Sequence, residues 1–315
     1  MKLKVSADTG KKFSKGAILI HGLIETHRFS TIVLSNTAKS KENNGFEVVF
    51  EDKTYLIGDE TRQITKNNLI LSKKTEEHRL CVYTMIAELI RQHTKETTDI
   101  DIELCLTMPL TEFLKKETRL EYMDFFKKDV KITVDGRIYS FNIVKIHPSF
   151  EGAGVLLRDP NKYRNKTVVV IDVGGLNMNY CVFNNLKPSA NLSGTLKHGG
   201  HVLISAIQGK LYNDFDAIFT EFEIIQIAKG EKQVPQAIKD VIASETKNHI
   251  SAIYNELDLK KINLNYNDVV FTGGTSELFS PYLDEFFVHG NATVSDDPGF
   301  DNVIGSLEIL RSQNG

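Results

Sequence analysis

The apolar and polar positions of the chain follow two patterns, which predict strands and helices in alternation. Short apolar runs separated by charged turns follow the N-terminus and are typical of an antiparallel meander. They occupy residues 16–22, 46–50 and 54–58. From residue 72 to residue 93, apolar side chains recur every three or four positions, the period of a helix with one face in the core. Residues 101–109 form a near-continuous apolar run, which predicts a buried strand ending at a proline.

The next elements complete the first half of the chain. We expect a helix from about residue 111 to residue 126, followed by a hairpin over 131–148 whose two-residue turn is Asp135-Gly136. The polar stretch DPNKYRNK at 159–166 combines turn formers with charges and separates apolar segments on either side. A domain boundary is therefore expected at this stretch.

The second half opens on the apolar strand TVVVIDV at 167–173, which meets two adjacent glycines and returns as a strand at 180–183. Residues 193–207 then pass from a glycine turn into an apolar helix. The remaining expected elements are helices at 214–228 and 234–257, a strand at 268–272, a helix at 276–287 and a last helix that begins near Pro298. Strands and helices alternate in each half, so the fold class is α/β with mixed sheets.

Two turns in which an aspartate precedes glycine are candidates for binding the phosphates of a nucleotide. In DTGKKFSK, Gly10 allows backbone N–H groups to approach a phosphate closely, Asp8 could hold magnesium through water, and Lys15 could reach the β- and γ-phosphates. In DVGGLNMN, Asp172 is a second magnesium candidate, and Gly174 and Gly175 form a second cradle. Two such turns, about one domain apart, suggest one nucleotide held between two similar halves.

A third glycine turn and several charged residues complete the candidate chemistry. Gly273, Gly274 and Thr275 lie between a strand and a helix N-terminus, a place where anions and purines are often bound. Lys11 and Lys12 suit a triphosphate, although a solvated charged turn explains them almost as well. We interpret His198 and His201 as part of a solvated loop rather than a metal site, because no third ligand is nearby in the sequence. No GxxxxGK[ST] motif is present, so this is not a P-loop.

The composition indicates which binding partners and which cellular compartment to expect. The 315 residues carry a net charge of −3, which disfavours direct binding to a nucleic-acid backbone. The three cysteines are not clustered and indicate a reducing cytosol. We expect a cytoplasmic protein with no membrane contact, because no apolar run approaches the roughly 20 residues of a membrane-spanning helix and the start has no signal-peptide pattern.

The order of these turns resembles the actin-like ATPases, the superfamily of actin, sugar kinases and heat-shock chaperone ATPases, and most closely the ParM-type plasmid-segregation actins. LCLTMPLTEF resembles their strand ending in Leu-Pro-Leu, YLIGDE their Tyr-x-x-Gly hairpin, and DPGFDNVIGSLEIL their closing segment. The resemblance implies an actin-like two-domain fold, with a mixed sheet flanked by helices in each domain and a nucleotide cleft between the domains. The domains would be 1–160 and 161–305, with a helix over 306–315 packing back on the first.

The resemblance also implies roles for particular residues. Asp8, Gly10 and Lys15 fall on the first phosphate motif, Asp172, Gly174 and Gly175 on the second, and Gly273, Gly274 and Thr275 on the adenosine motif. Glu221 and Glu223 lie where the family places an acid that contacts the ribose or the base, although an exposed helix face is the plainer interpretation for at least one of them.

Two departures from the family pattern concern hydrolysis. Asn177 and Asn179 stand where the family has a threonine and an acid, and asparagine cannot carry the charge of the acid. The position after Pro148, where the family places a glutamate or glutamine to orient the attacking water, holds Ser149. Glu151 follows two residues later, and we favour Glu151 for this role because a carboxylate can align water and accept a proton.

The resemblance implies a filament-forming ATPase that binds ATP and Mg²⁺, with GTP as an open alternative. Its partners would be copies of itself and a DNA-binding adaptor at a plasmid centromere. One alternative is a small-molecule kinase of the same superfamily, although no acidic motif for an acceptor lies between the two phosphate turns. Another is a scaffold or cell-shape filament that scarcely hydrolyses nucleotide, which the two asparagines favour. A chaperone is disfavoured because the length leaves no room for a substrate domain.

Overall fold

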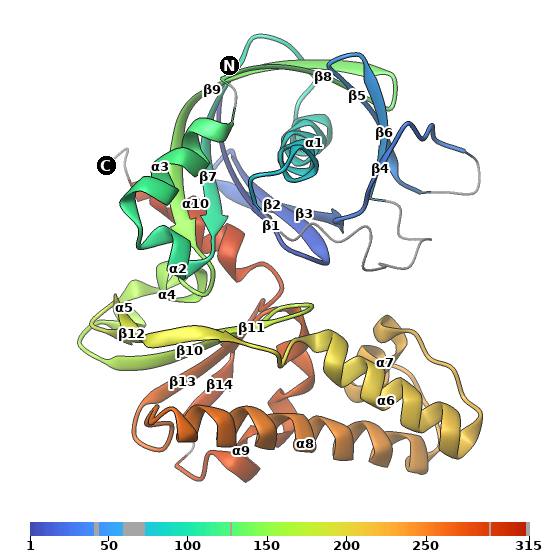
Figure 1. Cartoon of the computed structure of the whole chain (residues 1–315), viewed down its shortest axis with the longest axis vertical. Helices are drawn as coiled ribbons and strands as arrows, with labels where there is room; N and C mark the ends of the chain where they lie inside the picture. The colour runs from blue at the N-terminus through green and yellow to red at the C-terminus, as the bar shows by residue number, and fades with distance from the viewer. Residues whose placement is uncertain (41–43, 59–72, 127, 290, 313–315) are drawn as a thin grey trace. The chain divides into compact units, whose positions relative to one another are not determined.

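The computed structural model describes residues 1–40, 44–58, 73–126, 128–289 and 291–312, which form two compact units (Figure 1). The first unit is Met1–Arg158 together with the segment that begins at Asn302, and the second is Asp159–Asp301. The predicted α/β class with mixed sheets is confirmed in both units. Asp59 and Glu60 of YLIGDE, Ser72 of the first predicted helix and residues 313–315 of the last predicted helix lie outside the described residues.

The first unit is built on a nine-stranded mixed sheet with the strand order β3-β2-β1-β7-β9-β8-β5-β6-β4. The three strands β1, β7 and β9 run parallel to one another, and their neighbours on both sides are antiparallel. The strands are β1 Lys2–Thr9, β2 Phe13–Ile20, β3 Leu23–Ser30, β4 Val33–Ser35, β5 Phe46–Phe50, β6 Lys53–Ile57, β7 Ile100–Met108, β8 Asp129–Val134 and β9 Arg137–Phe150. Both residues of the Asp135-Gly136 turn have positive φ (47° and 77°), as a two-residue hairpin turn requires.

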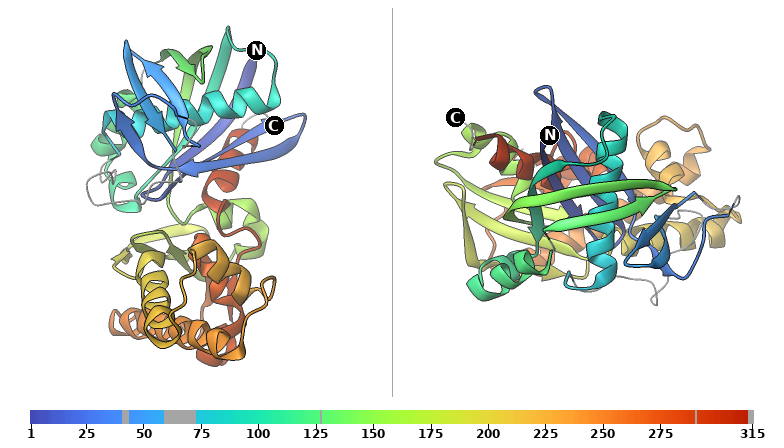
Figure 2. Two further views of the ribbon diagram at one scale, coloured as in Figure 1. Left: turned by 90° about the vertical axis from the view of Figure 1, so that its right-hand side faces the viewer. Right: turned by 90° about the horizontal axis from the view of Figure 1, so that it is seen from above.

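The core of the first unit surrounds helix α1 (Glu76–His93), and the sheet bends around it (Figures 1 and 2). Every residue from Leu80 to Ile90 is buried, whereas the three- and four-residue spacing predicted a helix with only one face in the core. A helix that strands enclose has no face left for solvent, so its polar residues need partners. Glu88, for example, is fully buried and its carboxylate pairs with Arg91 at 2.6 Å.

Three short helices and one longer helix complete the first unit. The helix predicted over 111–126 is divided, because the backbone of Lys115 is extended (φ −88°, ψ 111°). The helices are α2 Leu110–Phe113, α3 Lys116–Phe125, α4 Gly154–Arg158 and α10 Asp301–Ser312. Helix α10 packs closely against α4, since a Cβ on Gly305 would lie 2.1 Å from the carbonyl oxygen of Gly154.

The second unit is built on a five-stranded mixed sheet with the order β12-β11-β10-β13-β14. The strands are β10 Thr167–Val173, β11 Met178–Asn184, β12 Lys187–Leu196, β13 Asp268–Thr272 and β14 Ala292–Val294. The helices are α5 Pro160–Tyr163, α6 Gly200–Phe215, α7 Glu221–Ala228, α8 Gln236–Leu259 and α9 Leu283–Phe286, with 3₁₀ turns η2 Gly274–Leu278 and η3 Ser280–Tyr282. This unit has its own apolar core between the sheet and the helices.

Two helix predictions in the second unit were wrong in extent. The helix expected over 214–228 begins only at Glu221, because α6 continues to Phe215 and ends at Asp216 in the left-handed conformation (φ 50°). The helix expected over 276–287 is instead two 3₁₀ turns and a short α-helix. Pro281 lies in this segment and lacks the N–H group that a continuous helix would need.

Candidate functional site

The first predicted phosphate turn joins β1 to β2, and Asp8 and Lys15 lie opposite each other in that hairpin. Directly paired residues of neighbouring strands project from the same face, so the carboxylate and the ammonium share one side of the hairpin. The Gly10 N–H bonds to the carbonyl oxygen of Phe13 at 3.0 Å and closes the turn. Lys12 lies over the Phe13 ring, with Nζ 5.3 Å from the ring centroid, and Lys11 is half-buried.

A lysine that the sequence did not single out links two of the predicted site residues. Lys73 Nζ lies 2.9 Å from Glu151 Oε1 and 3.3 Å from Asp8 Oδ1, and it also donates to the Thr107 carbonyl oxygen at 2.9 Å. Burial disfavours the charge of Lys73, but the carboxylates of Glu151 and Asp8 outweigh burial and raise its pKa above the ordinary value. Asp8 and Glu151 are therefore two carboxylates that share one buried cation.

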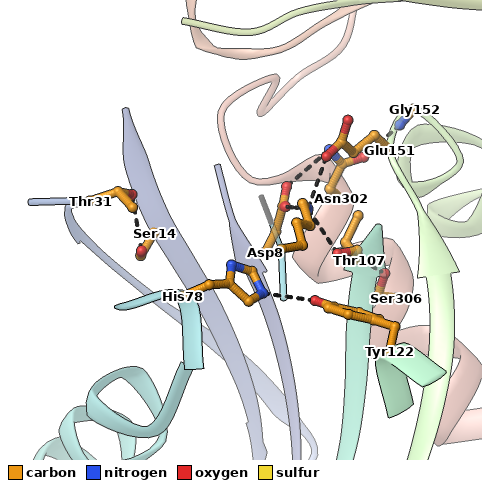
Figure 3. Close-up of polar contacts among 11 residues, drawn as sticks. Asp8, Ser14, Thr31, His78, Thr107, Tyr122, Glu151, Gly152, Asn302 and Ser306 are labelled. Atoms are coloured by element: carbon orange, nitrogen blue, oxygen red, sulfur yellow. Dashed lines mark hydrogen bonds and ion pairs between the residues drawn. The ribbon is translucent and has the colours of Figure 1, made fainter. Parts of the chain in front are cut away.

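Asn302, at the start of α10, connects the Asp8 turn to the turn that carries Glu151 (Figure 3). Its amide Nδ2 donates to Asp8 Oδ2 at 3.2 Å, and its Oδ1 accepts from the Gly152 N–H at 3.0 Å. Gly152 has φ 85°, a conformation that favours glycine. These two bonds fix the Asp8 carboxylate relative to the backbone that follows Glu151.

The two candidates for orienting water occupy different surroundings. Ser149 lies within β9 beside Thr107 and is buried, and its hydroxyl has no hydrogen-bond partner in the part of the chain that the structure describes. Glu151 directly follows the strand, with its N–H bonded to the Met108 carbonyl oxygen at 3.0 Å. The carboxylate of Glu151, and not the hydroxyl of Ser149, is thus held in the cluster with Asp8.

The second predicted phosphate turn follows β10 and is packed against the start of α6. The first N–H groups of this helix are bonded to the turn, from Gly200 to the Gly174 oxygen and from His201 to the Gly175 oxygen, both at 2.8 Å. Asp172 is only 7% exposed. Asn179 lies opposite Asp172 in the β10–β11 pair, and its Oδ1 accepts a bond from the Thr195 hydroxyl at 2.7 Å.

The third glycine turn contacts the second one directly. Gly273 has φ 86°, and a Cβ there would lie 2.6 Å from Asp172 Oδ1 and 2.4 Å from the Val173 carbonyl oxygen. A Cβ on Gly200 would lie 1.9 Å from the Thr275 hydroxyl oxygen. Only glycine permits these approaches. The second unit therefore gathers Asp172, the glycines after it, the α6 N-terminus and the Gly273–Thr275 turn into one cluster.

The two glutamates of α7 have different surroundings. Glu223 forms a capping box with Thr220, and its carboxylate also bonds to Lys232. The bond from Lys232 and the bonds from the Thr220 backbone and hydroxyl lower the pKa of Glu223 to about 2. Its carboxylate is thus engaged within the helix cap. Glu221 lies in the first turn of α7 and is half-buried.

His198 lies in the loop before α6, as predicted, but its side chain is partly buried and paired rather than fully solvated. Its Nε2 lies 2.6 Å from Glu256 Oε2, and its carbonyl oxygen accepts a bond from His249 Nε2 at 3.1 Å. Burial lowers the pKa of His249 to about 4, although the bond to His198 acts in the opposite direction. These contacts attach the loop before α6 to α8. His201, by contrast, is exposed.

Comparison with known proteins finds one matching family and several solved structures of similar fold. Residues 6–154 match the family described as the actin like proteins N terminal domain. The fold of the whole chain is similar to the apo ParM of pSK41, with a TM-score of 0.76, 17% identity and coverage of 99% of this chain and 98% of that one. The fold of the chain is actin-like.

Two further solved structures share this actin-like fold. The Alp12 filament structure gives a TM-score of 0.71 at 22% identity and covers 100% of this chain and 99% of that one. The Bacillus thuringiensis ParM with ATP gives 0.75 at 15% identity and covers 100% of both chains. No curated protein sequence matches the chain. Among the described residues, no helix is long and apolar enough to cross a membrane.

Asp8 in the first unit and Asp172 in the second are each a carboxylate that would hold magnesium through water. Asp8 and Asp172 are each only 7% exposed, and each lies at the end of a strand beside a glycine turn. Asp8 already accepts bonds from the Lys73 ammonium and the Asn302 amide. Oxygen ligands of this kind are the ones that Mg²⁺ prefers.

Lys73 and Asn302 are the site residues that the sequence did not reveal. Lys73 stands in a charged run before α1, where a solvated surface is the ordinary interpretation, and Asn302 lies within the closing segment that carries the family resemblance. The place of Asn302 within DPGFDNVIG, the segment that resembles the family's closing segment, was the available signal for this residue. Nothing in the local sequence distinguishes Lys73 from Lys74.

Proposed function

We propose that this actin-like protein is an ATPase that assembles into filaments when it binds ATP and Mg²⁺, and that the filaments segregate plasmid DNA through an adaptor protein. The observation that carries the proposal is the pair of carboxylates, Asp8 and Glu151, held by one cation beside a glycine turn. The glycine cluster around Asp172 in the second unit supports it independently. The likeness to ParM and Alp12 supports filament formation, because the Alp12 structure is that of a filament.

Each unit contributes a set of residues to nucleotide binding in this proposal. In the first unit Asp8, Gly10 and the lysines of the turn bind the phosphates, with Lys15 nearest to Asp8 in the hairpin. In the second unit Asp172, the glycines after it and Asn177 bind phosphate, while the Gly273–Thr275 turn and Glu221 bind the nucleoside. The Bacillus thuringiensis ParM with ATP has the same fold and supports ATP as the nucleotide, with GTP as the alternative.

Hydrolysis in this proposal depends on Glu151. Its carboxylate orients a water molecule in line with the γ-phosphorus and accepts the proton as the new P–O bond forms and the bond to the bridging oxygen breaks. Asp8 and Asp172 would hold Mg²⁺ through water, and the ion would neutralise charge on the phosphates. Backbone N–H groups of the glycine turns stabilise the same charge. Ser149 is the lesser candidate for the water, because a neutral hydroxyl is a weak proton acceptor.

Light scattering and pelleting test the proposal. Purified protein should assemble with Mg²⁺ and ATP and remain in the supernatant without nucleotide, and no assembly under any nucleotide condition would overturn the filament function. Phosphate release should be lost in Glu151→Ala and largely retained in Ser149→Ala. The opposite pattern would transfer the water-orienting role to Ser149. Segregation is tested by co-pelleting with an adaptor and its centromere DNA, since the chain's charge of −3 gives it no basis for binding DNA directly.

A filament that binds ATP but hydrolyses it slowly is the second candidate, and Asn179 favours it. This residue lies opposite Asp172 and is neutral, and its side-chain oxygen is bonded to Thr195. The position therefore supplies no second charge beside Asp172. Phosphate release measured in the assembly mixture separates the two candidates, because a static filament would pellet without releasing phosphate.

A further inference from the structure

The Lys73 ammonium has three acceptors, one for each of its hydrogens. They are Glu151 Oε1 at 2.9 Å, the Thr107 carbonyl oxygen at 2.9 Å and Asp8 Oδ1 at 3.3 Å. The side chain is 12% exposed, and those of Asp8 and Glu151 are 10% and 18% exposed. Contacts that satisfy a buried ammonium completely hold it in one place, and they hold its partners as well.

The backbone on both sides of this contact is also fixed. Lys73 precedes Thr75, whose hydroxyl caps α1 by accepting from the His78 N–H at 3.2 Å, and α1 is buried within the sheet. The Thr107 oxygen belongs to β7, one of the three parallel strands at the centre of the sheet. The ammonium thus joins the start of the core helix, a central strand and both carboxylates.

Charge explains why the carboxylates need this cation. Asp8 and Glu151 carry like charges in a region of low solvent access, so without Lys73 they would repel each other and move apart. Asp8 is also held by Asn302 Nδ2, whereas the Glu151 carboxylate has its ion pair to Lys73 as the contact that joins it to Asp8. Lys73 therefore places the Glu151 carboxylate beside that of Asp8.

We propose that Lys73 is a positioning residue for hydrolysis, which holds the Glu151 carboxylate where it orients the attacking water. The inference rests on the proposed ATPase function and adds a residue that acts on the reaction through Glu151. Displacing a catalytic group by about 1 Å can cost on the order of 100-fold in rate. Loss of the ammonium should therefore lower kcat and leave the binding of the nucleotide largely to the glycine turns.

A double-mutant cycle with Glu151→Gln tests this role in the full-length protein. Lys73→Met keeps the length of the side chain and removes its charge, and we expect kcat for phosphate release to fall roughly 10- to 100-fold with little change in KM for ATP. In the Glu151→Gln background, Lys73→Met should cause no further fall, because the group that it positions is already disabled. Lys73→Arg retains the charge but not the three-way contact, and its kcat should lie between those of wild type and Lys73→Met.

Lys74→Met is the matched control, since Lys74 is the next residue and pairs with Glu121 in a more exposed contact. It should release phosphate at the wild-type rate. If Lys73→Met does not fold, phosphate release by Lys73→Arg and by the double variant tests the inference instead. The double variant loses one positive and one negative charge together, so the net charge of the cluster is unchanged.

The outcomes separate the inference from the proposed function. Wild-type kcat in Lys73→Met or Lys73→Arg, or an additive loss in the double variant, would overturn the positioning role while leaving the ATPase function in place. A wild-type protein that releases no phosphate with Mg²⁺ and ATP would overturn the ATPase function, and the role of Lys73 with it.

Discussion

Asp172 is the residue on which the cluster of the second unit converges, because a glycine of another turn packs directly against its carboxylate. The position of Gly273 leaves no room for a side chain, and its left-handed φ of 86° would strain any other residue. The carboxylate therefore lies directly against the backbone of the Gly273 turn. A group held so closely by backbone is suited to a binding role that tolerates little movement.

Asp172→Ala should abolish assembly that depends on nucleotide, because the phosphate turn of the second unit loses its carboxylate. Pelleting and light scattering with Mg²⁺ and ATP measure the effect. Asp268→Ala is the matched control in the same sheet, since Asp268 pairs with Lys166 in an exposed contact, and exposed ion pairs contribute little. Normal assembly in Asp172→Ala would show that the turn after β10 does not bind the phosphates.

At the scale of elements, we expect replacement of glycine by alanine to have opposite effects on the stability of the protein at two helix positions. Gly305→Ala in α10 should destabilise the protein by about 1–3 kcal/mol, because the added Cβ would lie 2.1 Å from the Gly154 carbonyl oxygen and force α10 away from α4. Gly209→Ala in α6 should stabilise it by roughly 1 kcal/mol, because that position faces open space and alanine favours a helix. Thermal unfolding of both variants checks the pair, and equal shifts would contradict the close packing of α10.

The cap of α7 predicts a dependence of stability on acid pH. The pKa of Glu223 falls from 4.5 to about 2 in the folded protein, so its charged form is favoured by folding. Its contribution is complete above about pH 4.5 and is lost as the pH falls toward 2. Glu223→Gln should remove this part of the acid destabilisation, as measured by unfolding between pH 2 and 6. A pH profile identical to wild type would show that the cap is not formed in solution.

At the scale of the whole molecule, the two units differ in how the chain builds them. The second unit is one continuous segment with its own core, whereas the first unit includes α10, whose Val303, Leu307 and Leu310 are buried. A fragment of residues 159–301 should therefore unfold cooperatively by itself. A fragment of residues 1–158 should not, until a peptide covering α10 is added. Circular dichroism during thermal unfolding tests both fragments, and a cooperative transition of 1–158 alone would contradict the need for α10.

The parts of the fold and site that the sequence predicted are those set by local chemistry. The Asp-Gly pairs and the periodic apolar runs determine turns and elements over a few residues, so the strand at 268–272 and the Asp135-Gly136 turn were confirmed. The sequence did not predict that α1 is enclosed on all sides, because this depends on how distant strands curve. It also did not reveal Lys73, whose acceptors come from Asp8, Thr107 and Glu151, far away along the chain.

The return of the chain to the first unit sets an order of events during translation. Asn302, which bonds both Asp8 and the turn after Glu151, leaves the ribosome only after the whole second unit has been synthesised. The second unit can fold while the first still lacks α10. The carboxylate cluster is therefore completed late, and a nascent chain that stops short of Asn302 cannot assemble it. Synthesis itself thus delays the full cluster of the first unit until residues 1–301 have emerged.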